Sequence, residues 1–185
     1  MRFECDETKI VDERAGTGPY GWEKLMDADE KTIEERLTDL GVTLPDAPAP
    51  AANYVPYVVS GLLVFISGQL PMVNGDCPHR GALGRDVDLE HGVEAARVCA
   101  INILSQLKAA CNGDLTKVVR CVRLGGFVAA TSDFEQHPAV INGASDLIAE
   151  ALGPAGAHAR AAVGVASLPF GVPVEVEAVF EIVAG

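Results

Sequence analysis

A single arginine near the C-terminus stands among small residues, in the segment His158-Ala-Arg160-Ala-Ala-Val-Gly-Val. An arginine on a mostly apolar strand is costly to bury unless an acidic group pairs with it. Its planar guanidinium is also well suited to bind a carboxylate through two parallel hydrogen bonds. Two interpretations of Arg160 therefore stay open: it binds a carboxylate ligand, or it points into solvent from the outer face of a strand.

Two glutamates follow on the last predicted strand, where Glu175 and Glu177 alternate with valines and an alanine. Glutamates on one face of a strand most often form a solvated surface. They gain chemical interest if one of them lies opposite Arg160. Antiparallel pairing of the last two predicted strands would allow that arrangement.

The cysteines and histidines give weaker signals. The five cysteines are Cys5, Cys77, Cys99, Cys111 and Cys121, an odd number with no C-x-x-C spacing. They are best interpreted as free thiols that pack as small apolar groups, the alternative being a nucleophile or a metal ligand. Cys77-Pro-His79 is the one Cys/His cluster and supplies too few ligands for a structural zinc site. The sequence favours surface positions for all four histidines, and no metal is expected.

Common catalytic signatures are missing from the chain. There is no G-x-S-x-G, P-loop, G-x-G-x-x-G or H-E-x-x-H motif. The chain therefore lacks the usual signatures of serine hydrolases, nucleotide-binding proteins and zinc proteases.

The elements that position these residues follow from hydrophobic periodicity, which predicts the order β-β-α-β-α-β-β. The predicted strands are Tyr54–Ser60, Leu62–Gln69, Val118–Ala130, Ala159–Ser167 and Val174–Val183, and the predicted helices are Leu89–Asn112 and Pro138–Leu152. Two helices packed on one sheet give an α+β fold. Gly125-Gly126 marks a plausible bulge, and the long polar loop 71–88 indicates a function or a partner contact.

The N-terminal quarter differs from the rest. Residues 1–29 show no sustained period, whereas Thr32–Gly41 predicts a short amphipathic helix with a Thr32/Glu35 capping box. A proline-rich linker begins at Asp46. The expected organisation is an acidic N-terminal extension over residues 1–46 and one domain over residues 47–185.

Charge and composition exclude several function classes. The 185 residues carry a net charge of −12, and residues 1–46 contribute −7 of it from 6 basic and 13 acidic side chains. This acidity argues against nucleic-acid binding. No apolar run is long enough to span a bilayer, and the acidic N-terminus does not resemble a signal peptide. A cytoplasmic protein without membrane contact is expected.

Four motifs in order resemble the Rid family of YjgF-type reactive-intermediate deaminases, also known as endoribonuclease L-PSP-like proteins. They are the run from Arg160 through Leu168-Pro169 to Glu175-Val-Glu177, the segment Ser67-Gly68-Gln69-Leu70-Pro71, the turn Gly113–Val119, and Asp133-Phe134 followed by Asn142. Each motif is weak alone, but the ordered set is specific and spans roughly residues 50–185.

The resemblance implies a chorismate-mutase-like fold, a homotrimer, and ligand clefts between subunits. It also implies hydrolysis of 2-imino or enamine acids to 2-keto acids and ammonia without a metal or an organic cofactor. By resemblance, Arg160 binds the substrate carboxylate, Glu175 positions or activates water, and Tyr54 is the active-site tyrosine. The backbone of Gly68 lies near the imine, and Asn142 contributes to substrate binding.

The chain also departs from the family pattern. Ala162 stands where relatives often have cysteine, the 71–88 loop is long, and about 45 extra residues precede the domain. An alternative hypothesis is therefore a non-catalytic trimer that binds a small carboxylate metabolite. Endoribonuclease action, ascribed to some relatives, is disfavoured by the acidic charge.

Overall fold

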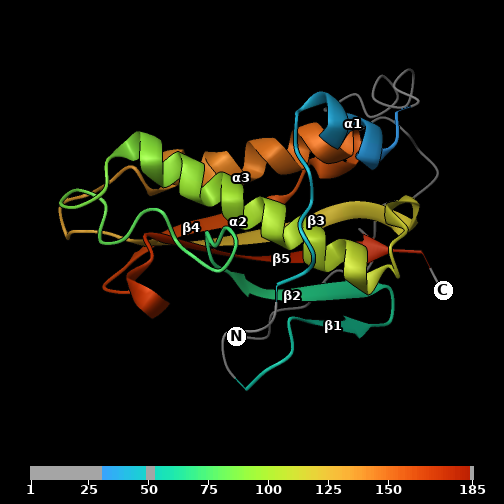
Figure 1. Ribbon diagram of the computed structural model, residues 1–185, viewed down its shortest axis with the longest axis horizontal. Helices are drawn as coiled ribbons and strands as arrows, with labels where there is room; N and C mark the ends of the chain where they lie inside the picture. Colours follow the sequence, from blue (N-terminus) through green and yellow to red (C-terminus); the bar gives the residue numbers. More distant parts are fainter. Residues whose placement is uncertain (1–30, 49–52, 184–185) are drawn as a thin grey trace, which may run out of the picture. The chain divides into compact units, whose positions relative to one another are not determined.

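Five strands form one sheet in the order β1-β2-β5-β3-β4 in the computed structural model (Figure 1), which describes residues 31–48 and 53–183. The strands are β1 (Tyr57–Ser60), β2 (Leu63–Gln69), β3 (Val118–Ala129), β4 (Ala159–Val165) and β5 (Val174–Ile182). The helices are α1 (Ile33–Asp39), α2 (Leu89–Ala110) and α3 (His137–Leu152), with short 3₁₀ turns η3 (Leu115–Lys117), η4 (Gly153–Gly156) and η5 (Pro169–Gly171). The predicted α+β class and element order are confirmed.

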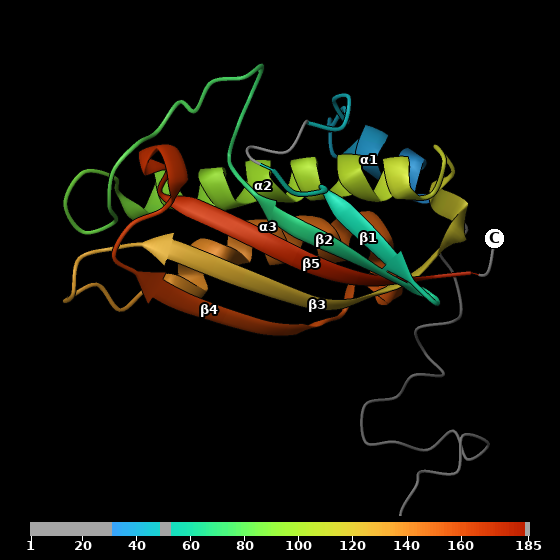
Figure 2. The same ribbon diagram turned by 90° about the horizontal axis from the view of Figure 1, so that it is seen from below.

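Helices α2 and α3 lie side by side on one face of the sheet (Figure 2). Alternate residues of β5, including Val176 and Phe180, are fully buried beneath them. The helices approach closely at Gly143, where a Cβ would overlap the backbone carbonyl of Val93. Small residues at such a crossing allow close helix packing. The result is a two-layer domain in which only one sheet face belongs to the core.

The opposite face of the sheet is covered by no described element. Glu175, Glu177 and Val179 project from β5 on this side, because their neighbours in sequence are the buried core residues. Phe65 pairs in register with Val179 on one side and with Val58 on the other, and both Val58 and Phe65 are about half exposed. An antiparallel sheet can face water on one side, but several large apolar side chains on that side favour contact with another surface.

Strands β4 and β5 are not neighbours, because β3 lies between them. β3 pairs with β5 in antiparallel orientation and with β4 in parallel orientation. The parallel pair arises because α3 forms the crossover from β3 to β4, and a crossover returns the chain in the same direction. The arrangement considered from the sequence, in which the last two strands pair and place a glutamate opposite Arg160, therefore does not occur.

The two glycines of β3 serve close packing and do not form a bulge. The register of β3 against β5 shifts near residues 118–123, whereas Gly125 and Gly126 pair regularly. A Cβ at Gly125 would lie 2.6 Å from Glu177 Oε1, and one at Gly126 would lie 2.5 Å from Ile141 Cγ1. The predicted bulge at this pair is wrong, because each glycine makes room for a side chain on its own face of the sheet.

The N-terminal helix α1 packs within the same compact unit, which begins at Lys31. Thr32 Oγ1 accepts a hydrogen bond from Glu35 N, and Glu35 Oε2 accepts one from Thr32 N, so the predicted capping box is confirmed. Leu37 of this helix is buried in the common core. The division of the chain at residue 46 remains a prediction, and residues 1–29 of the predicted extension lie outside the described residues. Within the described part of the chain, none of the helices has the length and apolar character needed to cross a bilayer.

Candidate active site

The five side chains or backbone positions expected at the site fall into two groups in one chain. Arg160 and Asn142 lie together at the β4 edge of the sheet. Gly68 lies against Glu175 and lines a cavity together with Tyr54. The expected site is thus divided between two places in one chain.

Arg160 is held by neutral groups on α3. Its Nη1 donates to Asn142 Oδ1 at 2.8 Å and to Ser145 Oγ at 3.1 Å. The strand places it there because Arg160 pairs in register with Leu124, whose side chain faces the helix layer. Residues in one row of a sheet share a face, so the guanidinium lies beside α3 at the exposed sheet edge.

The positive charge of Arg160 has no carboxylate partner among the described residues. Four other arginines do have one, within 4 Å of an acidic side chain: Arg80, Arg85, Arg97 and Arg123. The Nε and Nη2 groups of Arg160 donate no hydrogen bond to any described residue. These two atoms form one edge with which a guanidinium binds a carboxylate bidentately. In a chain of net charge −12, such an arginine has the properties of an anion site.

Glu175 lies near the middle of the sheet on the open face. Partial burial, and secondarily the charge of Glu177, raise the pKa of its carboxyl above the ordinary value. Arg123 Nη1 donates to Glu177 Oε1 at 2.7 Å, so Glu177 has a cation partner. Glu175 has none among the described residues. A carboxylate with a raised pKa that is not committed to an ion pair binds a proton more readily than an ordinary glutamate and is suited to proton transfer.

Gly68 allows the Glu175 carboxylate to lie directly against the β2 backbone. A Cβ at residue 68 would overlap Glu175 Oε1 and lie 2.7 Å from Cδ. Any residue other than glycine would therefore displace this carboxylate. The glycine of the Ser67-Gly68-Gln69 segment thus has a packing role that its sequence position alone did not specify.

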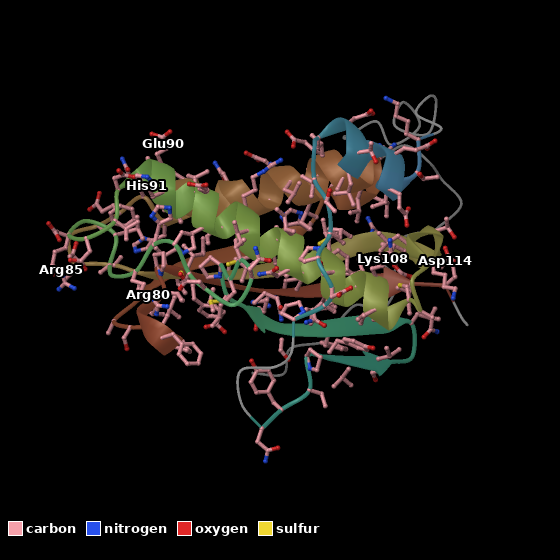
Figure 3. All side chains as sticks on the ribbon, viewed as in Figure 1. Arg80, Arg85, Glu90, His91, Lys108 and Asp114 are labelled. Carbon is pink, nitrogen blue, oxygen red and sulfur yellow. The ribbon has the colours of Figure 1, made fainter. Side chains whose placement is uncertain are left out.

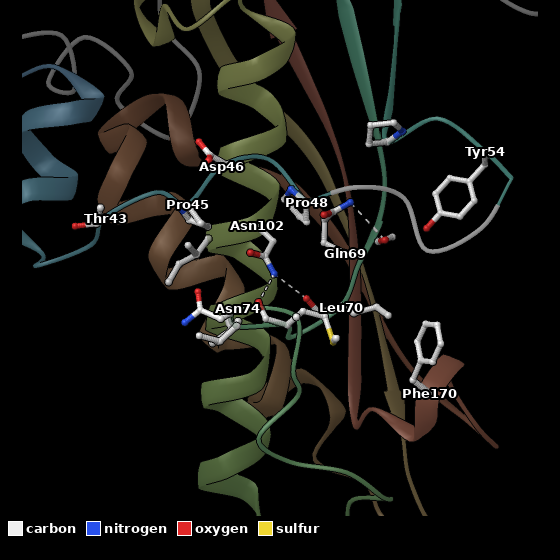
Figure 4. A pocket seen from close by; sticks show the side chains of 17 residues that line it. Thr43, Pro45, Asp46, Pro48, Tyr54, Gln69, Leu70, Asn74, Asn102 and Phe170 are labelled. Atoms are coloured by element: carbon white, nitrogen blue, oxygen red, sulfur yellow. Dashed lines mark hydrogen bonds between the residues drawn. The ribbon is translucent and has the colours of Figure 1, made fainter.

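A cavity of about 880 Å³ opens beside Gly68 (Figure 4). Figure 4 shows the rings of Tyr54 and Phe170 on the same side of this cavity, which α2 borders on the other. Asn102 of α2 donates from Nδ2 to the carbonyls of Leu70 and Met72, at 2.9 and 3.1 Å, and so fixes the turn after β2. A cavity of this size lies within the range of small-molecule sites.

The loop 71–88 holds Phe170 at the edge of this cavity. Arg80, which projects from the loop (Figure 3), donates from Nη1 to the carbonyl of Phe170 at 2.6 Å. Gly81 N donates to the carbonyl of Gly171 at 2.8 Å. Phe170 has a φ of 57°, an uncommon conformation for a residue with a bulky side chain, and the residue is 60 % exposed. Such strain persists only where neighbouring structure enforces it.

One chain does not bring Arg160 and Glu175 together. Arg160 lies on the helix side of the sheet, and Glu175 lies on the open side in a strand two positions away. Within a single chain Glu175 is therefore not within reach of Arg160, and their meeting in a cleft between subunits remains a prediction. The sheet pleat is the reason, because alternate residues of a strand project to opposite faces.

The described thiols are structural. Cys77, Cys99, Cys111 and Cys121 are free and buried. Burial raises the pKa of Cys121 to about 12 and that of Cys99 well above its ordinary value, so both are poor nucleophiles. Across residues 31–48 and 53–183, no three His, Cys, Asp or Glu side chains are arranged to hold a metal.

Sequence reasoning missed Ser145 and Phe170. Ser145 lies three residues after Asn142, and residues at that spacing share a helix face, so the helix prediction contained the signal. Phe170 follows Leu168-Pro169 but gave no signal of its own, because its position depends on Arg80, which is 90 residues distant in sequence.

Comparisons with known proteins cover most of the chain. Residues 34–178 match the family described as "YjgF/chorismate_mutase-like, putative endoribonuclease". Protein TCP17 of Trypanosoma cruzi is 48 % identical over 152 residues, which are 81 % of this chain and 94 % of that protein. The crystal structure of Atu1372 from Agrobacterium tumefaciens is 55 % identical with a TM-score of 0.77, covering 82 % of this chain and 92 % of that one. A "putative endoribonuclease" structure from Shewanella oneidensis is 34 % identical with a TM-score of 0.79, covering 82 % of this chain and all of that one (100 %).

Proposed function

The chain belongs to the YjgF/chorismate-mutase-like family, the Rid family expected from its motifs, and from this premise we propose that it hydrolyses 2-imino acids. The products are the 2-keto acid and ammonia, and the tautomeric enamine acids are substrates of the same reaction. The observation that carries the proposal is Arg160, whose charge no described carboxylate neutralises and whose Nη1 is fixed by Asn142 and Ser145.

Each proposed residue has one task in the reaction. Arg160 binds the substrate carboxylate and thereby orients the imine carbon. Glu175 accepts a proton from water as the water oxygen forms a bond to that carbon. The C=N electron pair moves to the nitrogen, which takes that proton from Glu175 to give a carbinolamine. The hydroxyl proton of the carbinolamine then passes through Glu175 to the nitrogen, the C–N bond breaks, and ammonia leaves as the C=O bond forms. The raised pKa of Glu175 supports this role, because a general base is most effective when its pKa approaches the working pH.

The site needs a second copy of the chain. Arg160 lies at an edge strand, and Glu175 lies on an open sheet face that carries half-exposed apolar side chains such as Phe65 and Val163. We propose a homotrimer in which the edge of one chain meets the open face of the next, so that Arg160 and the neighbour's Glu175 share a cleft. Gly68 and Tyr54 contribute on the Glu175 side, and Asn142 on the Arg160 side.

A non-catalytic carboxylate binder is the second candidate. The separation of Arg160 from Glu175 within one chain favours it, since an arginine alone binds an anion without activating water. This candidate predicts binding of a keto acid without turnover. Both candidates use Arg160, and only hydrolysis also requires Glu175.

The test is hydrolysis of 2-iminopropanoate generated in situ from alanine by an amino-acid oxidase, measured above the spontaneous rate. The wild-type protein should accelerate the reaction, and Arg160→Ala should reduce the rate to background. Arg97→Ala is the matched control, because Arg97 pairs with Glu150 between α2 and α3 and has no place in the proposed site. Equal rates of hydrolysis for wild type and Arg160→Ala would contradict the proposal. RNA decay measured with the same proteins separates endoribonuclease action from imine hydrolysis.

A further inference from the structure

His158 and Ser145 form a hydrogen-bonded network next to Arg160, close to η4. His158 is half-buried two residues before Arg160. Its Nδ1 lies 2.6 Å from the carbonyl of Gly156, and its Nε2 lies 3.0 Å from Ser145 Oγ. A carbonyl oxygen can only accept, so the Nδ1 atom carries the proton. In the neutral ring, Nε2 is then the acceptor, and the Ser145 hydroxyl donates a hydrogen bond to it.

Ser145 transmits this orientation to Arg160. With its proton directed at His158, the hydroxyl presents its lone pairs to Arg160 Nη1, which donates at 3.1 Å. Asn142 Oδ1 accepts from the same Nη1 at 2.8 Å. Two acceptors at one nitrogen restrict rotation of the guanidinium and leave the Nε–Nη2 edge for a ligand. Without the ring, the serine hydroxyl could rotate and point its own proton toward the guanidinium.

We propose that His158 and Ser145 are positioning residues that hold Arg160 in the orientation for carboxylate binding. The inference rests on the proposed function for the identity of the ligand, but its geometry depends only on the four contacts given above. The surface role expected for His158 from the sequence does not account for a ring with both nitrogens engaged in hydrogen bonds.

The expected kinetic effect falls on KM. The substrate carboxylate does not change in the reaction, so its contact with Arg160 is similar in substrate and transition state, and weakening this contact raises KM more than it lowers kcat. Loss of one hydrogen bond to a charged group corresponds to about a tenfold rise in KM. A residue with only a structural role would instead lower the fraction of folded protein, which reduces apparent kcat and leaves KM unchanged.

Three variants and a control test the positioning role of His158 and Ser145. Ser145→Ala should raise KM for 2-iminopropanoate about tenfold, and His158→Ala, which removes a hydrogen bond between neutral groups, about three- to tenfold. His158→Gln should stay close to wild type, because its amide oxygen can accept the serine proton in place of Nε2. Ser105→Ala is the matched control, since Ser105 is a helical serine that bonds only to the backbone carbonyl of Ile101. Its KM should equal that of wild type.

Two further measurements separate failure of the inference from failure of the proposed function. The dissociation constant of pyruvate, measured calorimetrically, should change among the four variants in the same way as KM, even if the protein binds without turnover. Nitrogen NMR of His158 should show the Nδ1–H tautomer. Wild-type hydrolysis with equal KM in all variants would overturn the positioning role alone, as would the opposite tautomer. A wild-type protein that neither hydrolyses the imine nor binds pyruvate would overturn both proposals.

Discussion

A single methyl group at Gly68 tests the role of Glu175 sharply. In Gly68→Ala the new Cβ would overlap Glu175 Oε1 and lie 2.7 Å from Cδ, whereas ordinary contact begins at 3.4 Å. The carboxyl carbon must therefore move by at least the 0.7 Å between these two values. The substitution thus displaces the proposed base without removing it.

The expected effects on rate and on stability differ in size. A displacement of about 1 Å at a reacting group costs on the order of 10²-fold in rate. The clash is with the far end of a flexible side chain, so the loss of folding free energy should lie near the low end of the about 1–3 kcal/mol typical of overpacking. That corresponds to a fall in Tm of about 2–4 °C for a chain of this size. Gly68→Ala should therefore be folded and nearly inactive.

The assay is imine hydrolysis by the purified variant, together with its Tm and oligomeric state. Gly125→Ala is the matched control, because its Cβ would clash with Glu177, which lies on the same strand and the same sheet face as Glu175. This control disturbs the Arg123–Glu177 pair, an exposed ion pair worth about 0.2–1 kcal/mol, and should keep wild-type activity. Wild-type kcat in a folded Gly68→Ala protein would refute the assignment of Glu175.

Three further predictions concern pH, helix capping and thiol chemistry. Because folding raises the pKa of Glu175, the native chain binds the proton of this carboxyl more tightly than the unfolded chain, and the stability contributed by this group falls as pH rises through the raised pKa. Glu175→Gln should therefore raise Tm at pH 7 while abolishing hydrolysis. An unchanged or lower Tm contradicts this reasoning. Thr32→Ala removes the N-cap of α1 and should cost about 1 kcal/mol in chemical denaturation, whereas no loss would show that α1 contributes little to the folded unit. Cys99 and Cys121 should resist alkylation at pH 8 in the native protein and react once it is unfolded; rapid labelling of the native thiols would be the contrary result.

The element order could be predicted because each element carries a local signal. The apolar spacing of α2, the capping box at Thr32 and the alternation in β5 are all readable within a few residues. The boundaries differ from the predicted ones by only a few residues, with β1 beginning at Tyr57 in place of Tyr54. Local periodicity and capping chemistry were sufficient for this part.

The pairing of strands could not be predicted in the same way. Whether β4 joins β3 or β5 depends on the crossover through α3, which no short segment encodes. This pairing decides where Arg160 lies in the sheet. As a result, Arg160 and Glu175 are apart within one chain. The motifs therefore supplied candidate residues, while their distribution over two sheet faces could be established only from the three-dimensional structure. The contact between Arg80 and Phe170 is equally non-local.

The central claim is that Arg160 of one chain and Glu175 of another complete a hydrolytic site, and subunit complementation tests it most directly. Arg160→Ala and Glu175→Gln should each be inactive alone. When the two variants are unfolded, mixed in equal amounts and refolded together, chance assembly gives about a quarter of the interfaces an intact Arg160 and an intact Glu175. The account predicts recovery of about a quarter of the wild-type rate. A mixed assembly, confirmed by mass spectrometry, that remains inactive would contradict it.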